Sequence, residues 1–161
     1  MEVKTGYIYH IKDVFFDIVN DDSLMTNHER GKKRPTYFTI KDKDILWFIP
    51  LSSKVNKYKK IVSKKVEKYG RCDTILIREV LGKESAILIQ NAFPTLEKYI
   101  DHAHLLDNGK PAKVIKSLKD EILTNFKYMI KLKNKGINLF FTDIDKIKEI
   151  MLEELNKKSN K

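Results

Sequence analysis

The chain has 161 residues, of which 42% are hydrophobic and 34% charged, with a formal net charge of +10 and an isoelectric point of about 9.5. This length predicts one domain with a sizeable core, and the apolar content excludes an intrinsically disordered chain. The excess of Lys and Arg must lie on the surface, so a polyanionic partner is expected. Charge alone leaves open a basic protein that binds no nucleic acid.

The segments that would direct the chain to another compartment are missing from the sequence. The single cysteine, Cys72, excludes an internal disulfide framework and fits a reducing compartment. No apolar run approaches the roughly 20 residues that a membrane span needs. The first 16 residues lack the basic start, apolar centre and small-residue cleavage site of a signal peptide. We therefore expect a cytoplasmic protein.

The first half of the chain has the pattern of short strands followed by one helix. Strands are expected at 7–11, 36–40 and 45–49, with a short helix at 14–19 and a polar loop at 20–34. The charged residues 41–44 predict a hairpin between the second and third strands. A helix is expected at 54–70. One face of that helix is apolar and contains Val55, Tyr58, Ile61, Val62 and Val66.

The second half is mostly helical in pattern. Two strands are expected at 73–80 and 85–90. A helix should open at Pro94, a loop occupies 107–111, a long helix covers 113–133, and a last helix starts at Thr142. The helix from Pro94 would bury Leu96, Tyr99, Ile100 and Ala103. The long helix would bury Ile115, Leu118, Ile122, Phe126, Met129 and Ile130. We expect a single α+β domain at 1–155 with an antiparallel sheet, and a frayed basic tail at 156–161.

The most informative residues are Ser52, Ser53 and Lys54, which follow the third expected strand. Two hydroxyls and an ammonium beside a helix N-terminus can bind a phosphate. A structural alternative is that Ser53 only caps the helix that begins near Lys54. The hairpin would bring the start of one strand beside the end of the other. Lys33, in the basic run 32–34, should therefore lie near Ser53 at one edge of the sheet.

The expected helix at 54–70 also carries a basic ridge. Lysines recur at helical spacing on one face, and Tyr58 and Tyr69 lie among them. Such a ridge suits a nucleic-acid backbone, and the rings could stack on bases. Alternatively, Tyr58 packs in the core and the lysines only solvate the helix. The ridge consists of Lys57, Lys60, Lys64 and Lys68.

The histidines indicate no metal site. His102 and His104 are two positions apart on an expected helix, so they should point in different directions, and His10 stands alone. His28 lies in the polar loop and could reach the site, or it is simply a surface residue. The sequence has no Cys/His cluster, phosphate-binding glycine loop or nucleophile elbow. Neither a metal nor a cofactor is expected.

Several segments together resemble a known family. They are residues 7–10 (YIYH), 33–37 (KRPTY), 48–54 (FIPLSSK) and 86–94 (AILIQNAFP). From about residue 6 to residue 155 the chain resembles the endoribonuclease toxins of bacterial type III toxin–antitoxin systems, the ToxN, AbiQ and CptN group, with the CptN branch closest. The resemblance implies a compact, twisted antiparallel sheet like that of the MazF and Kid toxins, an SH3-like barrel with several packed helices.

The resemblance also implies an activity. Such toxins cleave RNA without metal by 2′-hydroxyl attack, which leaves 2′,3′-cyclic phosphate and 5′-hydroxyl ends. They process, and are inhibited by, a repetitive structured RNA antitoxin, such as a pseudoknot, in a closed protein–RNA assembly. Once released they cut messenger RNA in the bacterial cytoplasm, which arrests growth and defends against phage. The main alternative is a non-catalytic RNA- or DNA-binding regulator, and a metal-dependent nuclease is a second one.

The resemblance assigns roles to residues of the site. Lys33 matches the catalytic lysine of the family, and Ser52 and Ser53 match its hydroxyl pair. Val55 stands at the place of a second lysine, so Lys54 or Lys57 would replace it. Glu29 stands where the family has a loop tyrosine, which leaves the general base open between His28, a nearby tyrosine and a lysine whose pKa is lowered by neighbouring positive charges. The expected RNA contacts are Arg30, Lys32, Arg34, Tyr37, Tyr58, Lys60, Lys64 and Lys68.

Overall fold

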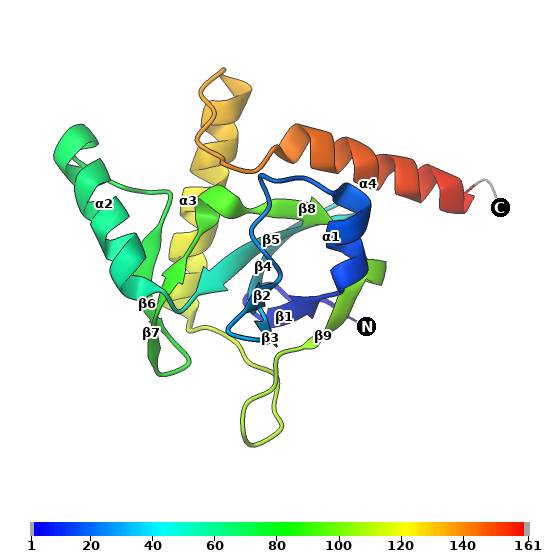
Figure 1. Cartoon of the computed structure of the whole chain (residues 1–161), viewed down its shortest axis with the longest axis horizontal. Helices are drawn as coiled ribbons and strands as arrows, with labels where there is room; N and C mark the ends of the chain where they lie inside the picture. Colours follow the sequence, from blue (N-terminus) through cyan, green and yellow to red (C-terminus); the bar gives the residue numbers. More distant parts are fainter. Residues whose placement is uncertain (1, 160–161) are drawn as a thin grey trace.

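The computed structural model describes residues 2–159, and an antiparallel sheet of seven strands forms its centre (Figure 1). The hydrogen-bonded order is β6-β7-β5-β4-β1-β9, and β8 pairs with β5 beside this path. Because the path ends at β6 and β9, the sheet is not closed into a barrel. The strands are β1 (Ile8–Ile11), β4 (Thr36–Asp42), β5 (Ile45–Ser52), β6 (Leu76–Val80), β7 (Lys83–Ile87), β8 (Phe93–Thr95) and β9 (Ile100–Ala103).

Four α-helices surround this sheet in the described part of the chain. In Figure 1, α2 stands apart on one side with β6 and β7, while α4 crosses above β8. The α+β class and the antiparallel sheet are thus confirmed. None of the helices at 2–159 is both long and apolar enough to cross a membrane. They are α1 (Asp13–Val19), α2 (Val55–Tyr69), α3 (Lys116–Asn134) and α4 (Ile144–Ser159), with 3-10 turns η1 (Ile89–Asn91) and η2 (Glu97–Tyr99).

The β4–β5 hairpin is the centre of the sheet. Its register runs from Thr36 opposite Pro50 to Asp42 opposite Ile45, as the charged turn between the strands predicted. Every residue of β5 is buried. A strand covered on both faces needs a nearly continuous apolar sequence, and ILWFIPLS has one. The strand therefore delivers Ser52 to the rim of the sheet from a rigid position.

Aromatic rings fill the core on both sides of β5. Phe15 from α1 stacks on Phe93 from β8 at 5.3 Å between ring centroids. Trp47 from β5 contacts Phe126 from α3 at 5.6 Å. Because Phe126 also touches Phe140 just before α4, the rings join helices from both ends of the chain to the sheet.

Two tyrosines predicted to contact RNA belong to the interior instead. Tyr58 is 7% exposed and packs with Ile75, Ala86 and Leu88 in a small core beneath α2. Tyr37 is 1% exposed in the main core. The prediction that these rings contact RNA is therefore wrong for this conformation, and the core alternative for Tyr58 is confirmed.

The prediction of a helix that opens at Pro94 is wrong. Residues 93–103 form β8, the turn η2 and β9, which pair with β5 and β1. A helical period fits the apolar residues 96, 99, 100 and 103, but a short apolar segment can form either a helix or a strand. Here the segment pairs with the open edges of β5 and β1 and is therefore extended. Ile115 was also misplaced, since it precedes α3 and is 71% exposed.

The polar segment 20–34 contains structure that the sequence reading missed. β2 (His28–Glu29) and β3 (Lys32–Lys33) form a small hairpin whose turn residues, Arg30 and Gly31, have φ values of 54° and 77°. Positive φ at both turn residues is typical of a tight two-residue hairpin, and glycine at the second position is the signal for it. At the other end of the chain, α4 continues through Ser159, into the segment predicted to fray. Residues 160–161 lie outside the described residues.

We predict that Tyr58 stabilises the protein rather than binding RNA. Tyr58→Ala should lower the free energy of unfolding by about 3 kcal/mol, because it leaves a cavity beneath α2. Tyr58→Phe keeps the ring and should cost less than about 1.5 kcal/mol. Urea unfolding measures both values. Loss of RNA affinity in Tyr58→Phe at unchanged stability would instead place the hydroxyl on the RNA.

Candidate active site

The β2–β3 hairpin organises the polar residues at the end of β5. His28 pairs with Lys33, and Glu29 pairs with Lys32. Because side chains alternate along a strand, His28 and Lys33 share one face of the hairpin, and Glu29 points to the other. The hairpin therefore has an oxyanion face, built on Glu29, and a cation face, built on Lys33.

On the oxyanion face, four donors converge on the carboxylate of Glu29. Oε2 accepts hydrogen bonds from Arg34 at 2.6 Å and from the Ser52 hydroxyl at 2.9 Å. Oε1 accepts from the backbone N–H of Ser53 at 2.9 Å and from the Ser53 hydroxyl. Each oxygen thus has two donors, which fills the capacity of a carboxylate. The donors that the sequence predicted for a phosphate are here bound to an internal anion.

These donors differ in their access to solvent. Arg34 is 5% exposed and also donates to the carbonyls of Thr26 and Leu51. Ser52 is 3% exposed, and its hydroxyl oxygen accepts the N–H of Lys54 at 3.1 Å. Ser53 is exposed. The predicted surface contact between Arg34 and RNA is therefore wrong for this conformation, and of the serine pair only Ser53 can meet a large ligand.

The structural alternative for Ser53 is also wrong. Helix α2 has Lys54 as its N-cap, and no side chain caps it by a hydrogen bond. The Ser53 hydroxyl turns to Glu29 instead. The Ser53 hydroxyl thus donates to an ionised carboxylate, and a charge-assisted hydrogen bond of this kind is stronger than a neutral one.

Glu29 is an anion at neutral pH. Burial by itself would raise the pKa of Glu29, but hydrogen bonds from Ser53 and Ser52 and the charge of Arg34 outweigh it and lower the pKa to about 2. A group with this pKa and no unused lone pair cannot accept a proton from a substrate. Glu29 therefore orients the serines and balances Arg34.

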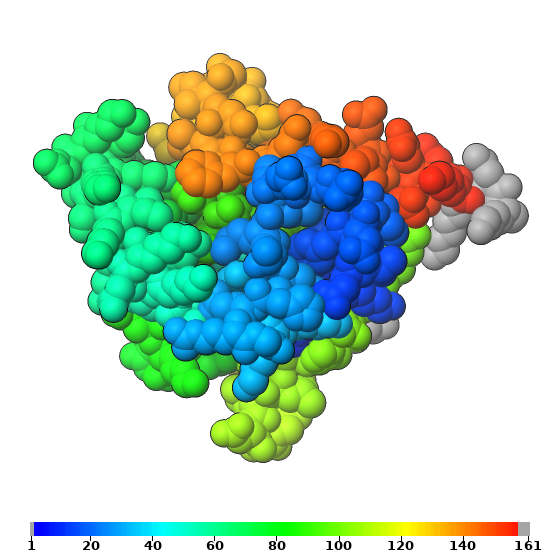
Figure 2. All heavy atoms as spheres, viewed as in Figure 1, coloured from blue at the N-terminus to red at the C-terminus, as the bar shows by residue number. Residues whose placement is uncertain are grey.

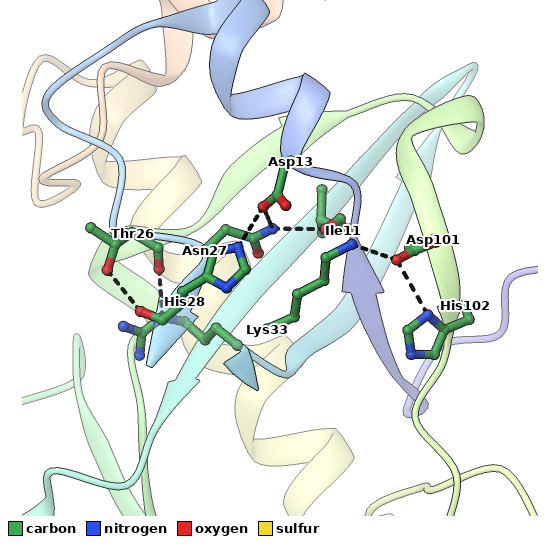
Figure 3. A network of polar contacts seen from close by, with 9 residues as sticks. Ile11, Asp13, Thr26, Asn27, His28, Lys33, Asp101 and His102 are labelled. Atoms are coloured by element: carbon green, nitrogen blue, oxygen red, sulfur yellow. Dashed lines mark hydrogen bonds and ion pairs between the residues drawn. The ribbon is translucent and has the colours of Figure 1, made fainter. Parts of the chain in front are cut away.

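On the cation face, Lys33 pairs with Asp101 from β9. Its Nζ lies 2.6 Å from Asp101 Oδ2 (Figure 3). This hydrogen bond raises the pKa of Lys33, the opposite of the lowering that the sequence reading considered. Lys33 is thus a fixed cation and not a base. Among residues 2–159, no hydrogen bond joins Lys33 to Ser52 or Ser53, although all three lie around one hairpin.

Beside Lys33, His28 pairs with Asp13, the first residue of α1. His28 Nε2 lies 2.8 Å from Asp13 Oδ1 (Figure 3). Asn27 donates to the same oxygen at 2.9 Å and to the carbonyl of Ile11 at 2.8 Å. Hydrogen bonds from Asn27 and His28 lower the pKa of Asp13. The imidazole is therefore held by a carboxylate that is itself fixed to the sheet.

The other histidines form a cluster that the sequence reading missed. His10 Nε2 lies 2.8 Å from His104 Nδ1, and the rings of His10 and His102 stack at 4.7 Å. Residues 102 and 104 flank a strand end and not a helical turn, so they share a face, and β1 brings His10 to it. Burial and the neighbouring His104 and His102 lower the pKa of His10 to about 4, so it is uncharged at neutral pH. The signal in the sequence was the alternation His-Ala-His.

The basic ridge is present as predicted, with Lys57, Lys60, Lys64 and Lys68 all exposed along α2. The Nζ of Lys57 lies 5.3 Å from the centre of the Tyr58 ring, and Lys54 is exposed at the helix start. On the face shown in Figure 2, the segment around the β2–β3 hairpin (blue) adjoins the beginning of α2 (cyan-green). Arg30 and Lys32 are exposed on that hairpin. Within the described residues, no three His, Cys, Asp or Glu side chains are arranged to hold a metal ion.

Two solved structures have this fold over nearly the whole chain. One is AbiQ, a lactococcal anti-phage endoribonuclease of a type III toxin–antitoxin system, with 16% identity, a TM-score of 0.66, and 98% of this chain and 100% of that chain covered. The other comes from a bacterial type III system in which a non-coding RNA pseudoknot selectively inhibits the toxin. It has 16% identity and a TM-score of 0.67, over 94% of this chain and 98% of that chain. No protein-family model and no curated protein matches the sequence.

The predicted resemblance to the AbiQ group is thereby confirmed at the level of the fold. The chain has the fold of type III toxins. Its assignment to the CptN branch stays a prediction, because neither comparison distinguishes the branches.

We predict that Glu29 makes stability depend on acid pH. Its pKa is about 2 in the folded protein and 4.5 as an ordinary glutamate, so the unfolded chain binds the proton more tightly. The resulting stabilisation is complete above about pH 5 and is lost as the pH falls toward 2. It amounts to on the order of 3 kcal/mol. Urea unfolding across pH 2–6 should therefore show a steeper decline for the wild type than for Glu29→Gln.

The exposed Glu67→Gln variant on α2 is the control, because no pair or hydrogen bond in the described residues holds that carboxylate. It should follow the wild-type curve. Parallel curves for Glu29→Gln and the wild type would mean that Glu29 is not ionised in this network.

Proposed function

We propose that this chain is a metal-independent endoribonuclease toxin of a type III toxin–antitoxin system. In this proposal it cleaves RNA by attack of a ribose 2′-hydroxyl on the adjacent phosphate, leaving 2′,3′-cyclic phosphate and 5′-hydroxyl ends. The observation that carries the proposal is the convergence of hydroxyl, backbone and guanidinium donors on one oxyanion, with a fixed lysine on the other face of the same hairpin. The likeness to AbiQ, described as an endoribonuclease, supports the same reaction class.

The residues divide the work as follows. Lys33 offsets the charge that gathers on the phosphoryl oxygens, and Asp101 keeps it protonated and in place. Ser53 holds a phosphate oxygen after its hydroxyl leaves Glu29, while buried Ser52 fixes the loop. Lys54 or Lys57 supplies the second positive charge. Each preorganised donor of this kind contributes roughly 3 kcal/mol, or about a hundredfold in rate.

The partner in this proposal is RNA. The neighbour inhibited by a non-coding RNA pseudoknot supports a repetitive structured RNA antitoxin, which the toxin processes and stays bound to in a closed protein–RNA assembly. The free toxin would cut messenger RNA in the bacterial cytoplasm and arrest growth. The anti-phage description of AbiQ supports a role in phage defence.

We predict cleavage of RNA in excess chelator, with Ser53 essential. The wild type should produce discrete fragments whose ends are 2′,3′-cyclic phosphate and 5′-hydroxyl. Ser53→Ala should cleave about a hundredfold more slowly, because a donor to the phosphate is lost. Mass spectrometry of the fragments identifies the ends, and initial rates give the loss. Circular dichroism and urea unfolding confirm that the variant is folded.

The alternative functions give different results in this experiment. Intact RNA together with a shifted gel band would identify a non-catalytic binding protein. Cleavage that stops in chelator would identify a metal-dependent nuclease. Full activity of folded Ser53→Ala would remove Ser53 from the mechanism.

We predict that the basic ridge binds the RNA backbone. Replacing Lys57, Lys60, Lys64 and Lys68 by Gln should weaken binding of the RNA and flatten its dependence on salt. Each lost phosphate contact lowers the slope of log affinity against log salt by about 0.7 for single strands. Filter binding from 50 to 300 mM salt, in about the range where such contacts are screened, measures the slope.

Two controls separate charge from position. A variant that keeps Lys57 tests the ridge without touching a candidate catalytic residue. A second variant removes the same number of positive charges from another part of the surface. It carries Gln in place of four exposed lysines on or beside α3, namely Lys116, Lys127, Lys131 and Lys135. An equal loss from this second set would mean that overall charge, and not the ridge, sets the affinity.

A further inference from the structure

We infer that His28 accepts the proton of the attacking 2′-hydroxyl, and that Asp13 is the residue that positions it. The inference rests on the proposed function and names the group that the reaction still lacks. The geometry points to it because His28 and Lys33 are directly paired on one face of the hairpin. Each is held by its own carboxylate, Asp13 for His28 and Asp101 for Lys33.

Most other ionisable groups around the hairpin already have partners. Glu29 has two donors on each oxygen. Lys33 is kept protonated by Asp101, and Asp101 is bound to Lys33 in turn. His10 and His104 bond to each other in the β1–β9 cluster. Two exposed imidazoles near the hairpin keep a ring nitrogen that no hydrogen bond in residues 2–159 uses. They are His28 and His102, whose Nδ1 lies 3.4 Å from Asp101 Oδ2. Only His28 is paired directly with Lys33 in the hairpin.

The contact with Asp13 determines which nitrogen that is. An ionised carboxylate can only accept, so the proton of the neutral ring lies on Nε2, toward Asp13 Oδ1. Nδ1 then carries the lone pair, and no hydrogen bond in residues 2–159 uses it. The His28 side chain is 53% exposed, so a ribose can reach it. Asn27, 6% exposed, prevents Asp13 from turning away.

The pairing with Lys33 puts the base beside the phosphate. Side chains of directly opposed residues start about 5 Å apart. A phosphate held by the Lys33 ammonium therefore brings its neighbouring 2′-hydroxyl within reach of the imidazole. The charged or titratable groups around this spot come from four elements. They are Asp13 from α1, His10 from β1, Lys33 from β3, and Asp101 and His102 from β9.

The step is balanced in atoms and charge. The 2′-oxygen bonds to phosphorus as its proton passes to His28 Nδ1, and the bond from phosphorus to the 5′-oxygen breaks. Asp13 stabilises the imidazolium that forms. The proton then returns through solvent to the 5′-oxygen, so the products are a 2′,3′-cyclic phosphate and a 5′-hydroxyl with no net proton change.

The first test is His28→Gln on two substrates with the full-length protein. One is ordinary RNA, and the other carries a bridging 5′-sulfur at the cleaved position, whose leaving thiolate needs no proton. A missing base slows both substrates, so kcat should fall about 10²- to 10⁴-fold on each. Added imidazole should restore part of the activity of His28→Ala.

The second test addresses Asp13 as a positioning residue. Asp13→Asn should lower kcat by up to about 100-fold and leave KM nearly unchanged, because misplacing a catalytic group affects the chemical step. The same substitution should cost nothing further in a His28→Ala background. Asp17→Asn, on the exposed side of the same helix, removes an equal charge and should keep wild-type activity.

The outcomes distinguish this inference from the proposed function. A wild type that does not cleave RNA refutes the function itself. If the wild type cleaves and folded His28→Gln is fully active, the function stands and the inference fails. Normal rates of His28→Gln on the sulfur substrate alone would make His28 the acid, which also overturns the assignment. Additive losses for Asp13→Asn and His28→Ala would show that Asp13 does not act through His28.

Discussion

The ion pair between Arg34 and Glu29 is the interaction on which the site depends. Arg34 is almost fully buried at the start of β4, and a buried guanidinium without an anion would be strongly destabilising. Glu29 supplies that anion from the β2–β3 hairpin. The same carboxylate binds Ser52 and Ser53, so it ties the hairpin to the end of β5 and to the start of α2. Two segments distant in sequence, the hairpin and the junction between β5 and α2, are thereby held together at one edge of the sheet.

Acidic residues in this site set the positions of other groups and do no chemistry themselves. Glu29 orients two serines, Asp101 fixes Lys33, and Asp13 fixes His28. Each carboxylate holds its partner in one position, and Asp101 also offsets part of the charge of Lys33. The exposed lysines of α2 and the hairpin keep the surrounding surface positive, which a polyanionic substrate requires. The carboxylates thus order the side chains of the site, while the surrounding lysines attract polyanions from a distance.

The alternation of side chains along two short strands separates the site into two faces. Ser53 and Glu29 lie on one face, and His28 and Lys33 on the other. In the proposed function, a phosphate at the edge of the hairpin would meet the Ser53 hydroxyl from one face and Lys33, with His28 beside it, from the other. In the described structure the Ser53 hydroxyl donates to Glu29, so the proposed binding of a phosphate would exchange one oxyanion acceptor for another. The exchange leaves Glu29 Oε1 without the Ser53 hydroxyl and beside a second anion, so the other phosphate contacts have to offset this cost.

The sequence by itself determined the features whose signal is local. The aromatic and β-branched residues of β4 and β5, with the charged turn between them, predicted the central hairpin. The spacing of lysines predicted the ridge on α2, and residues 48–54 predicted a site at the end of β5. Only the tertiary structure decided the partners of that site. These partners are Asp13, Asp101 and the histidine cluster. The residues that touch are up to 94 positions apart in the sequence, as His10 and His104 are, and no local pattern encodes such pairs. It also decided that Tyr37 and Tyr58 are core residues and that 93–103 is extended. Burial and strand pairing depend on which surfaces are left open when the rest of the chain has packed.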